Sequence, residues 1–121
     1  MTTTEITATD RIIDTYFSMW NEAERAKRLE VIAEAWAPTG HYVDPLSDVS
    51  GYDGLADMVD SVRAQFPGAT LQRTSEIDMH HNVMKFAWNA TGSDGSVIVI
   101  GTDVCVLADD GRLSAIAGFF S

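Results

Sequence analysis

The chain has 121 residues, of which 45% are hydrophobic and 21% are charged. This composition is typical of a folded globular protein and is too apolar for a disordered one. Eight Lys and Arg residues stand against 18 Asp and Glu residues, giving a formal net charge of −10. Such an acidic chain disfavours nucleic acid and anionic membrane surfaces as partners.

The length and the cysteine content set further limits. The length fits a single domain spanning residues 1–121. The one cysteine, Cys105, excludes an internal disulfide and any zinc motif built on two cysteines. No stretch approaches the roughly 20 apolar residues that span a bilayer. The N-terminus has neither the basic start nor the apolar run of a secretory signal, so we expect a soluble, cytoplasmic protein.

The first half of the chain predicts three helices. After Thr9-Asp10, a pair suited to a helix N-cap, apolar residues recur at spacings of three and four: Ile13, Tyr16, Phe17 and Trp20. A second helix follows and is expected to end at Pro38-Thr39-Gly40. Residues 41–44 are predicted to be extended and residues 46–51 to form a loop. A third helix is expected from about Asp53 to Pro67-Gly68.

The second half predicts strands. Apolar and polar residues alternate over 70–80, which indicates one long strand. A second strand carries Met84, Phe86 and Trp88 on one face, and Gly92-Ser93-Asp94-Gly95 predicts a hairpin turn. Strands over 97–107 and 112–120 follow, joined by Asp109-Asp110-Gly111. Helices followed by antiparallel strands predict an α+β domain, with three N-terminal helices packed on one face of a curved, mainly antiparallel sheet.

The strand predicted over 97–107 is apolar on both faces. Alternation divides its apolar residues into two sets: Ile98, Ile100, Val104 and Val106 on one face, and Val99, Cys105 and Leu107 on the other. An antiparallel strand of this kind must be covered on both sides. The helices can cover one side, and we expect a second copy of the chain to cover the other in a homodimer.

Asp103 is the most informative candidate residue, because it lies in the middle of this apolar strand. A buried carboxylate must be paired, hydrogen-bonded or protonated. Gly101, two residues earlier on the same face, is expected to leave open space beside it. The carboxyl therefore either lines a cavity with a raised pKa, or serves as a structural acceptor near a bulge.

Two further side chains are candidates for chemistry. Asp44 ends a short extended segment just before Pro45, where it is either a functional carboxylate or a turn former. Tyr16 lies on the buried stripe of the first helix, and its hydroxyl needs a partner that Asp103 could supply. The apolar wall of such a pocket would be formed by residues that could equally be plain core: Met84, Phe86, Trp88 and Phe120.

The sequence offers no clear metal or cofactor site. It contains no dinucleotide fingerprint, no P-loop and no nucleophile elbow. His80 and His81 are adjacent on a predicted strand and should point to opposite faces, so we expect them not to share an ion. His41 has no spacing that relates it to them. We therefore expect neither a metal nor a cofactor.

Short motifs in the chain resemble those of a known superfamily. The chain resembles the nuclear transport factor 2-like superfamily in three features. These are the three helices, the Tyr-Val-Asp-Pro motif at 42–45, and the segment 101–107 that continues into Asp-Gly-Arg-Leu at 110–113. Within it, the chain is similar to the SnoaL-like proteins and the ketosteroid isomerases, from the first helix to Phe120. The resemblance implies a cone-shaped fold and dimers that pair through the sheet.

The resemblance also implies roles for the candidate residues. Asp44 matches the general base that moves a proton beside a carbonyl, Tyr16 matches the phenol of the oxyanion hole, and Asp103 matches its neutral carboxylic acid partner. Positions where the isomerases carry supporting tyrosines look like Trp36 and Val59, which we add to the predicted substrate-binding residues. The epoxide hydrolases of the superfamily need an arginine where Gly101 stands, and Arg73 is the remaining sheet arginine, so their chemistry is disfavoured.

The leading hypothesis is an enzyme that acts on a small, mostly apolar carbonyl compound by cofactor-free proton transfer, either isomerisation or aldol-type cyclisation. Asp44 would be the base, and Tyr16 and Asp103 would donate hydrogen bonds to the oxyanion. Asp78 and His80, on the more polar face of their strand, are further candidates. The alternative is a non-catalytic module that binds a hydrophobic metabolite or a protein partner.

Overall fold

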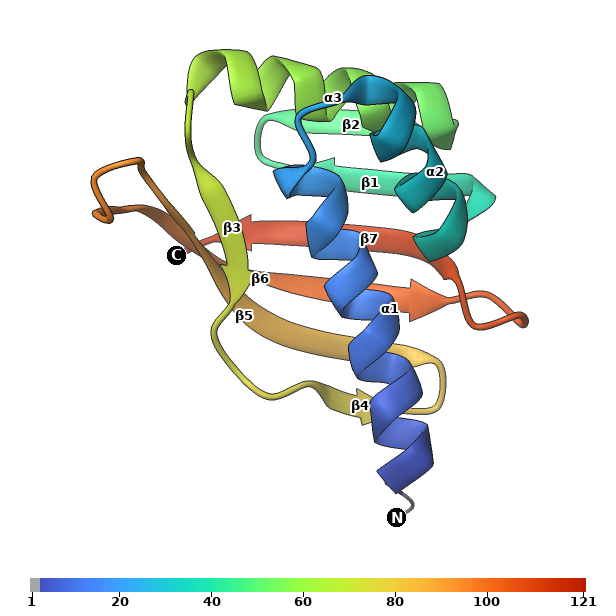
Figure 1. Cartoon of the computed structure of the whole chain (residues 1–121). Coiled ribbons are helices and arrows are strands. Elements are labelled where there is room, and N and C mark those ends of the chain that lie inside the picture. Colours follow the sequence, from blue (N-terminus) through green and yellow to red (C-terminus); the bar gives the residue numbers. More distant parts are fainter. Residues whose placement is uncertain (1–2) are drawn as a thin grey trace.

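The computed structural model describes residues 3–121 and shows three helices and seven strands. The helices cover one face of a curved sheet (Figure 1). This is the predicted α+β architecture. In chain order the elements are α1 (Thr3–Asn21), α2 (Arg25–Ala35), β1 (Trp36–Asp44), β2 (Ser47–Ser50), α3 (Gly51–Gln65), β3 (Thr70–Arg73), β4 (Asp78–His80), β5 (Val83–Thr91), β6 (Val97–Leu107) and β7 (Leu113–Phe120).

The strands form one sheet in the order β2-β1-β7-β6-β5-β3, with β4 also paired to β5. The pairs are antiparallel except for β1 and β7, which run in the same direction with Val43 opposite Ala117. Asp44 at the end of β1 and the last residues of β7 therefore lie at the same end of the strands (Figure 1). Since β7 pairs with both β1 and β6, the end of β1 also lies close to β6.

The core lies between α1 and the inner face of the sheet. Helix α1 crosses in front of β7, β6 and β5, while α2 and α3 lie over the β1–β2 end (Figure 1). The predicted apolar stripe of α1 is buried, and so is the inner face of β5: Ile13, Tyr16, Phe17, Trp20, Met84, Phe86 and Trp88. Burying each large apolar side chain contributes about 1.5–3 kcal/mol, so this contact is a major source of stability.

Three predicted boundaries in the first half are wrong. Helix α1 begins at Thr3, well before Thr9-Asp10, and α2 ends at Ala35. Trp36 and Pro38-Thr39-Gly40 belong to β1, where the pairing with β7 shifts between Trp36 and His41. Proline is tolerated at such an irregularity because no ladder hydrogen bond is required of it there. The predicted loop over residues 46–51 contains the short strand β2, which pairs back onto β1.

The long strand predicted over 70–80 is divided into β3 and β4, which both pair with β5. The break falls at Ser75. Its hydroxyl accepts a hydrogen bond from the Ala87 backbone N–H at 2.8 Å, and its carbonyl accepts one from Arg73. A side chain thus takes the place of a backbone partner, which interrupts the regular ladder.

The two faces of β6 are as predicted. Cys105 and Asp103 face the core, whereas Ile98 and Ile100 on the other face are exposed, at 42% and 50% of their surface. The homodimer that this outer face suggests stays a prediction. None of the helices in residues 3–121 has the length and hydropathy that a bilayer span requires.

Candidate functional site

Tyr16 on α1 and Asp103 on β6 meet in the core. The Tyr16 hydroxyl donates a hydrogen bond to Asp103 Oδ2 at 3.2 Å, and the two residues are 1% and 2% exposed. The predicted partnership of this phenol with this carboxyl is therefore confirmed as a contact. The distance exceeds the 2.7–2.8 Å that is usual between two oxygens, so the bond is a long one.

The surroundings of Asp103 favour a protonated carboxyl. Burial raises its pKa to about 7, while the hydrogen bond from Tyr16 and, less directly, the indole N–H of Trp88 act to lower it, and the charge of Asp44 raises it further. Its second oxygen, Oδ1, is buried without a hydrogen-bond partner among the described residues. Its surroundings therefore favour the protonated form far more than water does.

Tyr16 is suited to remain a hydrogen-bond donor. Burial raises the pKa of its phenol well above the ordinary value, and the charge of Asp103 and the neighbouring Tyr42 raise it further. A phenol in this position does not ionise at physiological pH, so its proton is available for donation.

Asp44 is held at the end of β1 by two hydrogen bonds. Its Oδ2 accepts one from the Tyr42 hydroxyl at 2.7 Å, and its Oδ1 accepts one from the Leu46 backbone N–H at 2.8 Å. The residue is partly buried, and Pro45 follows it. The turn after β1 thus fixes the orientation of the carboxylate.

Gly118 on β7 lies between the two carboxyl groups. A Cβ at this position would stand 3.0 Å from Asp103 Oδ1, 3.3 Å from Asp44 Cβ and 3.4 Å from the Tyr42 hydroxyl oxygen. Asp103 is the cross-strand partner of Gly118 on β6. The structure therefore brings Tyr16, Asp44 and Asp103 together on the inner face, where the absence of a side chain at Gly118 lets the two acidic residues approach closely.

Tyr42 and Gly118 were not predicted as functional residues from the sequence. A usable signal was present, because residues two apart on a strand share a face and Tyr42 precedes Asp44 by two. Tyr42 is 3% exposed. Burial raises the pKa of its phenol, and the charges of Asp103 and Asp44 raise it further, so this hydroxyl is also a stable donor.

The expectation of open space beside Gly101 is wrong. The indole of Trp88 and the carbonyl of Phe119 lie directly against Gly101, where a Cβ would overlap with both. Trp88 in turn packs edge-on against Phe120, with the ring centroids 6.2 Å apart. The glycine is needed because a large ring is packed there, so Gly101 leaves no space beside Asp103.

The predicted apolar wall is dispersed through the core. Met84, Phe86 and Trp88 are buried along the inner face of β5, and Trp36 and Val59 are fully buried in the core. Phe120 is 40% exposed at the end of β7. Phe17, which the prediction did not include, packs its ring against those of Tyr16 and Phe86, at 5.2 and 5.6 Å.

A separate cleft of about 340 Å³ lies between α1 and β3. It is lined by Asp14, Phe17, Ser18, Asn21, Leu71, Gln72 and Arg73. The Asn21 side chain closes one end with two hydrogen bonds to the Leu71 backbone, both at 3.0 Å. None of the nine predicted site residues is among those that line this cleft.

A family model of the SnoaL-like domain matches residues 13–116. The chain belongs to the SnoaL-like family. The matched range includes all three of Tyr16, Asp44 and Asp103. A search of curated proteins found no match.

Solved structures agree with this assignment. The SnoaL-like chain is similar to a candidate isomerase of the SnoaL-like family from Agrobacterium tumefaciens str. C58, with 35% identity and a TM-score of 0.89 over 95% of this chain and 98% of that one. A candidate SnoaL-like polyketide cyclase from Jannaschia sp. CCS1 has 14% identity and a TM-score of 0.75, over 95% and 86% of the two chains. The second likeness, at this identity, shows the fold alone.

The remaining polar candidates lie apart from this SnoaL-like site. Asp78 and His80 are exposed on β4. His80 and His81 do not point apart as expected, because His81 has φ +53° in the turn and the two Nδ1 atoms are 3.1 Å apart. His41 contacts Asp48 at 2.7 Å. Within residues 3–121 no group of three potential ligands could hold a metal ion.

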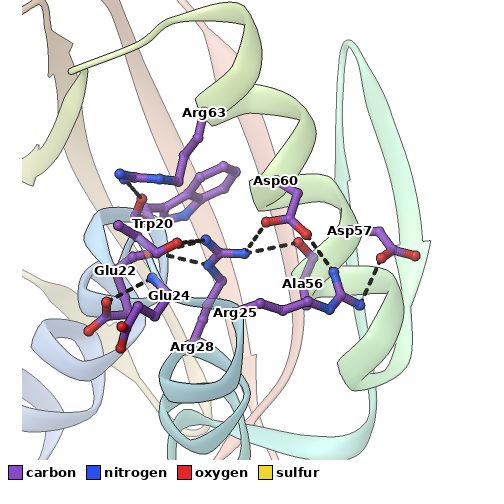
Figure 2. A network of polar contacts seen from close by, with 10 residues as sticks. Trp20, Glu22, Glu24, Arg25, Arg28, Ala56, Asp57, Asp60 and Arg63 are labelled. Atoms are coloured by element: carbon purple, nitrogen blue, oxygen red, sulfur yellow. Dashed lines mark hydrogen bonds and ion pairs between the residues drawn. The ribbon is translucent and has the colours of Figure 1, made fainter.

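A second buried charge, Arg28 on α2, was not singled out from the sequence. Its guanidinium contacts Asp60 on α3 at 2.5 Å and donates to the carbonyl oxygens of Glu22, Ala23 and Ala56 (Figure 2). The side chain is 1% exposed. It joins the segment after α1 to α3, and this network is distinct from the site around Gly118.

Proposed function

We propose that this protein catalyses cofactor-free proton transfer beside the carbonyl of a small, mostly apolar compound, by isomerisation or aldol-type cyclisation. The observation that carries the proposal is the arrangement around Gly118, where Asp44 and Asp103 flank one backbone position and Tyr16 contacts Asp103. A carboxylate and two neutral donors converging in an apolar surrounding match the requirements of enolate chemistry.

In the proposed reaction, Asp44 removes a proton from the carbon next to the carbonyl. The electron pair of that C–H bond moves to the carbonyl oxygen, which becomes an enolate oxygen. Tyr16 and protonated Asp103 donate hydrogen bonds to this oxygen. The enolate then takes this proton back from Asp44 at another carbon, or its carbon attacks a second carbonyl and closes a ring, and the new alkoxide takes the proton from Asp44. Removing one donor of this type typically costs about 2.7–4 kcal/mol of transition-state stabilisation.

The buried neighbours of Asp103 support an apolar substrate. Met84, Phe86 and Trp88 are buried on the inner face of β5. They exclude water there, which strengthens the hydrogen bonds of Asp103 and Tyr16. Phe120 is partly exposed at the same sheet edge as Asp44, where it packs on Trp88. We infer that substrate enters at this end of the sheet and packs on these rings, and that Trp36, whose ring meets that of Tyr16 at 6.0 Å, and Val59 complete the apolar lining.

The activity can be tested without knowledge of the natural substrate. A panel of small apolar ketones is incubated with the protein in D₂O, and exchange of the protons next to the carbonyl is followed by NMR. We expect accelerated exchange of at least one ketone, and Asp44→Asn should slow it by about 10³-fold because the base is lost. Asp48→Asn, an exposed carboxylate on β2, is the matched control and should leave the rate unchanged. Exchange that persists in Asp44→Asn contradicts the assignment of the base.

A second candidate function is ligand binding without chemistry. It is favoured by the cleft between α1 and β3, whose lining includes none of Tyr16, Asp44 and Asp103. A pure binding module that used this cleft would bind its ligand with an affinity that does not change in Asp44→Asn or Asp103→Asn. Titration of both variants with the same ligand therefore separates the two functions.

We further propose that the protein forms a homodimer through the outer face of its sheet. Ile98, Ile100 and Phe119 are exposed there, at 42%, 50% and 57% of their surface. A contiguous apolar face of this kind is typical of a protein–protein contact. Light scattering at micromolar concentration should give twice the monomer mass, and Ile100→Lys should reduce that mass to a monomer.

A further inference from the structure

Tyr42 contacts the proposed base directly. Its hydroxyl donates to Asp44 Oδ2 at 2.7 Å, whereas the Leu46 backbone N–H occupies Oδ1. The Tyr42 ring is held by an edge-on contact with Trp20, with the centroids 5.9 Å apart. Both carboxylate oxygens of the resting base are therefore engaged, and one of the two donors is a side chain whose O–H bond can rotate.

The same hydroxyl lies close to Asp103, the proposed hydrogen-bond donor to the enolate oxygen. The Cβ position over Gly118 is 3.4 Å from the Tyr42 oxygen and 3.0 Å from Asp103 Oδ1, the unpartnered buried oxygen. Asp103 and Tyr16 both influence the pKa of the Tyr42 phenol, which agrees with this proximity. Rotation about its C–O bond lets Tyr42 turn its proton from Asp44 toward the side of Gly118 on which Asp103 Oδ1 lies.

We propose that Tyr42 is a third catalytic donor, which holds Asp44 while that carboxylate is charged and turns to the substrate oxygen once Asp44 has taken the proton. This inference rests on the proposed proton transfer. In that step the negative charge leaves Asp44 and appears on the substrate oxygen, and a charged oxygen is the stronger acceptor. The preferred partner of Tyr42 therefore changes at the same moment. Tyr42 keeps its own proton throughout, and the substrate proton resides on Asp44.

A double-mutant cycle tests this exchange of partners. The probe is 4-nitrophenol, whose phenolate imitates the enolate, and its dissociation constant is measured by absorbance. The Asp44→Ala variant removes the competing acceptor, as proton transfer does. In that background Tyr42→Phe should weaken binding of the phenolate by about tenfold, because one hydrogen bond to a charged oxygen is lost. In the wild-type background the same change should weaken binding less than about twofold, because Tyr42 is engaged by Asp44.

Controls separate this inference from the proposed function. Tyr52→Phe removes a phenol that donates to the Trp36 carbonyl at 2.9 Å, outside the site, and should change no affinity. If Asp44→Ala does not fold, Asp44→Leu, which is closer in volume, replaces it. Equal effects of Tyr42→Phe in both backgrounds, or none in either, overturn the role of Tyr42. If the wild type does not bind the probe, or if Tyr16→Phe does not weaken its binding, the proposed function fails and this inference fails with it.

Discussion

Arg28 and Asp103 are both almost fully buried ionisable residues, yet their surroundings differ. Arg28 has a carboxylate partner in Asp60 and donates to three backbone carbonyls (Figure 2). Asp103 has one phenol as a partner and one oxygen without any, and no hydrogen bond or ion pair joins it to a cation in the described part of the chain.

The difference shows how the same fold accommodates two buried ionisable groups in different ways. A buried charge whose hydrogen bonds are all satisfied stays charged and joins elements together. A buried acid with too few partners holds its proton, as the raised pKa of Asp103 indicates. The under-partnered residue is the one that can exchange a hydrogen bond with a ligand, and it lies across Gly118 from Asp44.

The largest expected effect is on the pH dependence of stability, which tests whether buried Asp103 keeps its proton. The pKa of Asp103 rises from an ordinary value of 3.8 to about 7 on folding. Between these pH values the unfolded chain releases the proton that the folded chain keeps, so the free energy of unfolding falls as pH rises, by about 4 kcal/mol in total. Above about pH 7 both states are ionised and the loss is complete. Urea unfolding of the wild type and of Asp103→Asn from pH 4 to 8 measures this, and the difference between the two proteins should show the slope. Parallel curves would mean that Asp103 is ionised in the folded protein.

Substitution of Arg28 tests the other side of the comparison. Arg28→Met keeps much of the buried volume but leaves the carbonyls of Glu22, Ala23 and Ala56 without their donor. We expect the free energy of unfolding to fall by about 3 kcal/mol. The matched control is Arg25→Met, whose ion pairs with Asp57 and Asp60 are solvent-exposed, so we expect a much smaller loss. Equal losses in the two variants, measured by urea unfolding at pH 7, would remove the distinction between them.

The smallest expected effect is on kcat/KM, and it distinguishes a residue needed for activity from one needed for stability. Asp103→Asn keeps a donor in the site, so we expect kcat/KM for ketone exchange to fall only about tenfold, equivalent to about 1.4 kcal/mol. Arg28→Met should leave kcat/KM of the folded protein unchanged. An unchanged rate in Asp103→Asn together with a reduced rate in Arg28→Met would reverse the roles assigned to the two residues.

Periodicity and polarity predicted part of this molecule well. The helical spacing of apolar residues predicted that Tyr16 is buried. The apolar residues around Asp103 predicted that it is a buried acid, and the two side chains are in contact as expected. Both patterns are local in the sequence. Once a residue is assigned to a helix or a strand, the periodicity of that element determines whether its side chain faces the core. The two faces of β6 followed from simple alternation in the same way.

The errors arose where a long-range contact overrides a local pattern. Ser75 replaces a backbone partner on β5 and divides one strand into two, and Pro38 fits within β1 because the pairing with β7 is irregular there. The space beside Gly101 is filled by Trp88 from the neighbouring strand. Arg28 was missed because a charged residue on a polar helix gives no sign that carbonyls from two other segments will surround it. The roles of Asp44, Tyr16 and Asp103 in catalysis stay predictions.

The parallel pairing of β1 with β7 has a practical consequence. The amide of Ser121 is bonded to the Ile100 carbonyl at 2.9 Å, so the final residue is held against the sheet within three positions of Gly118. A purification tag fused after Ser121 would emerge three residues beyond Gly118, at the end of the sheet where we propose that ligand enters, and would obstruct it. Helix α1 begins on the far side of the molecule (Figure 1), so a tag on that end keeps binding assays free of this artefact.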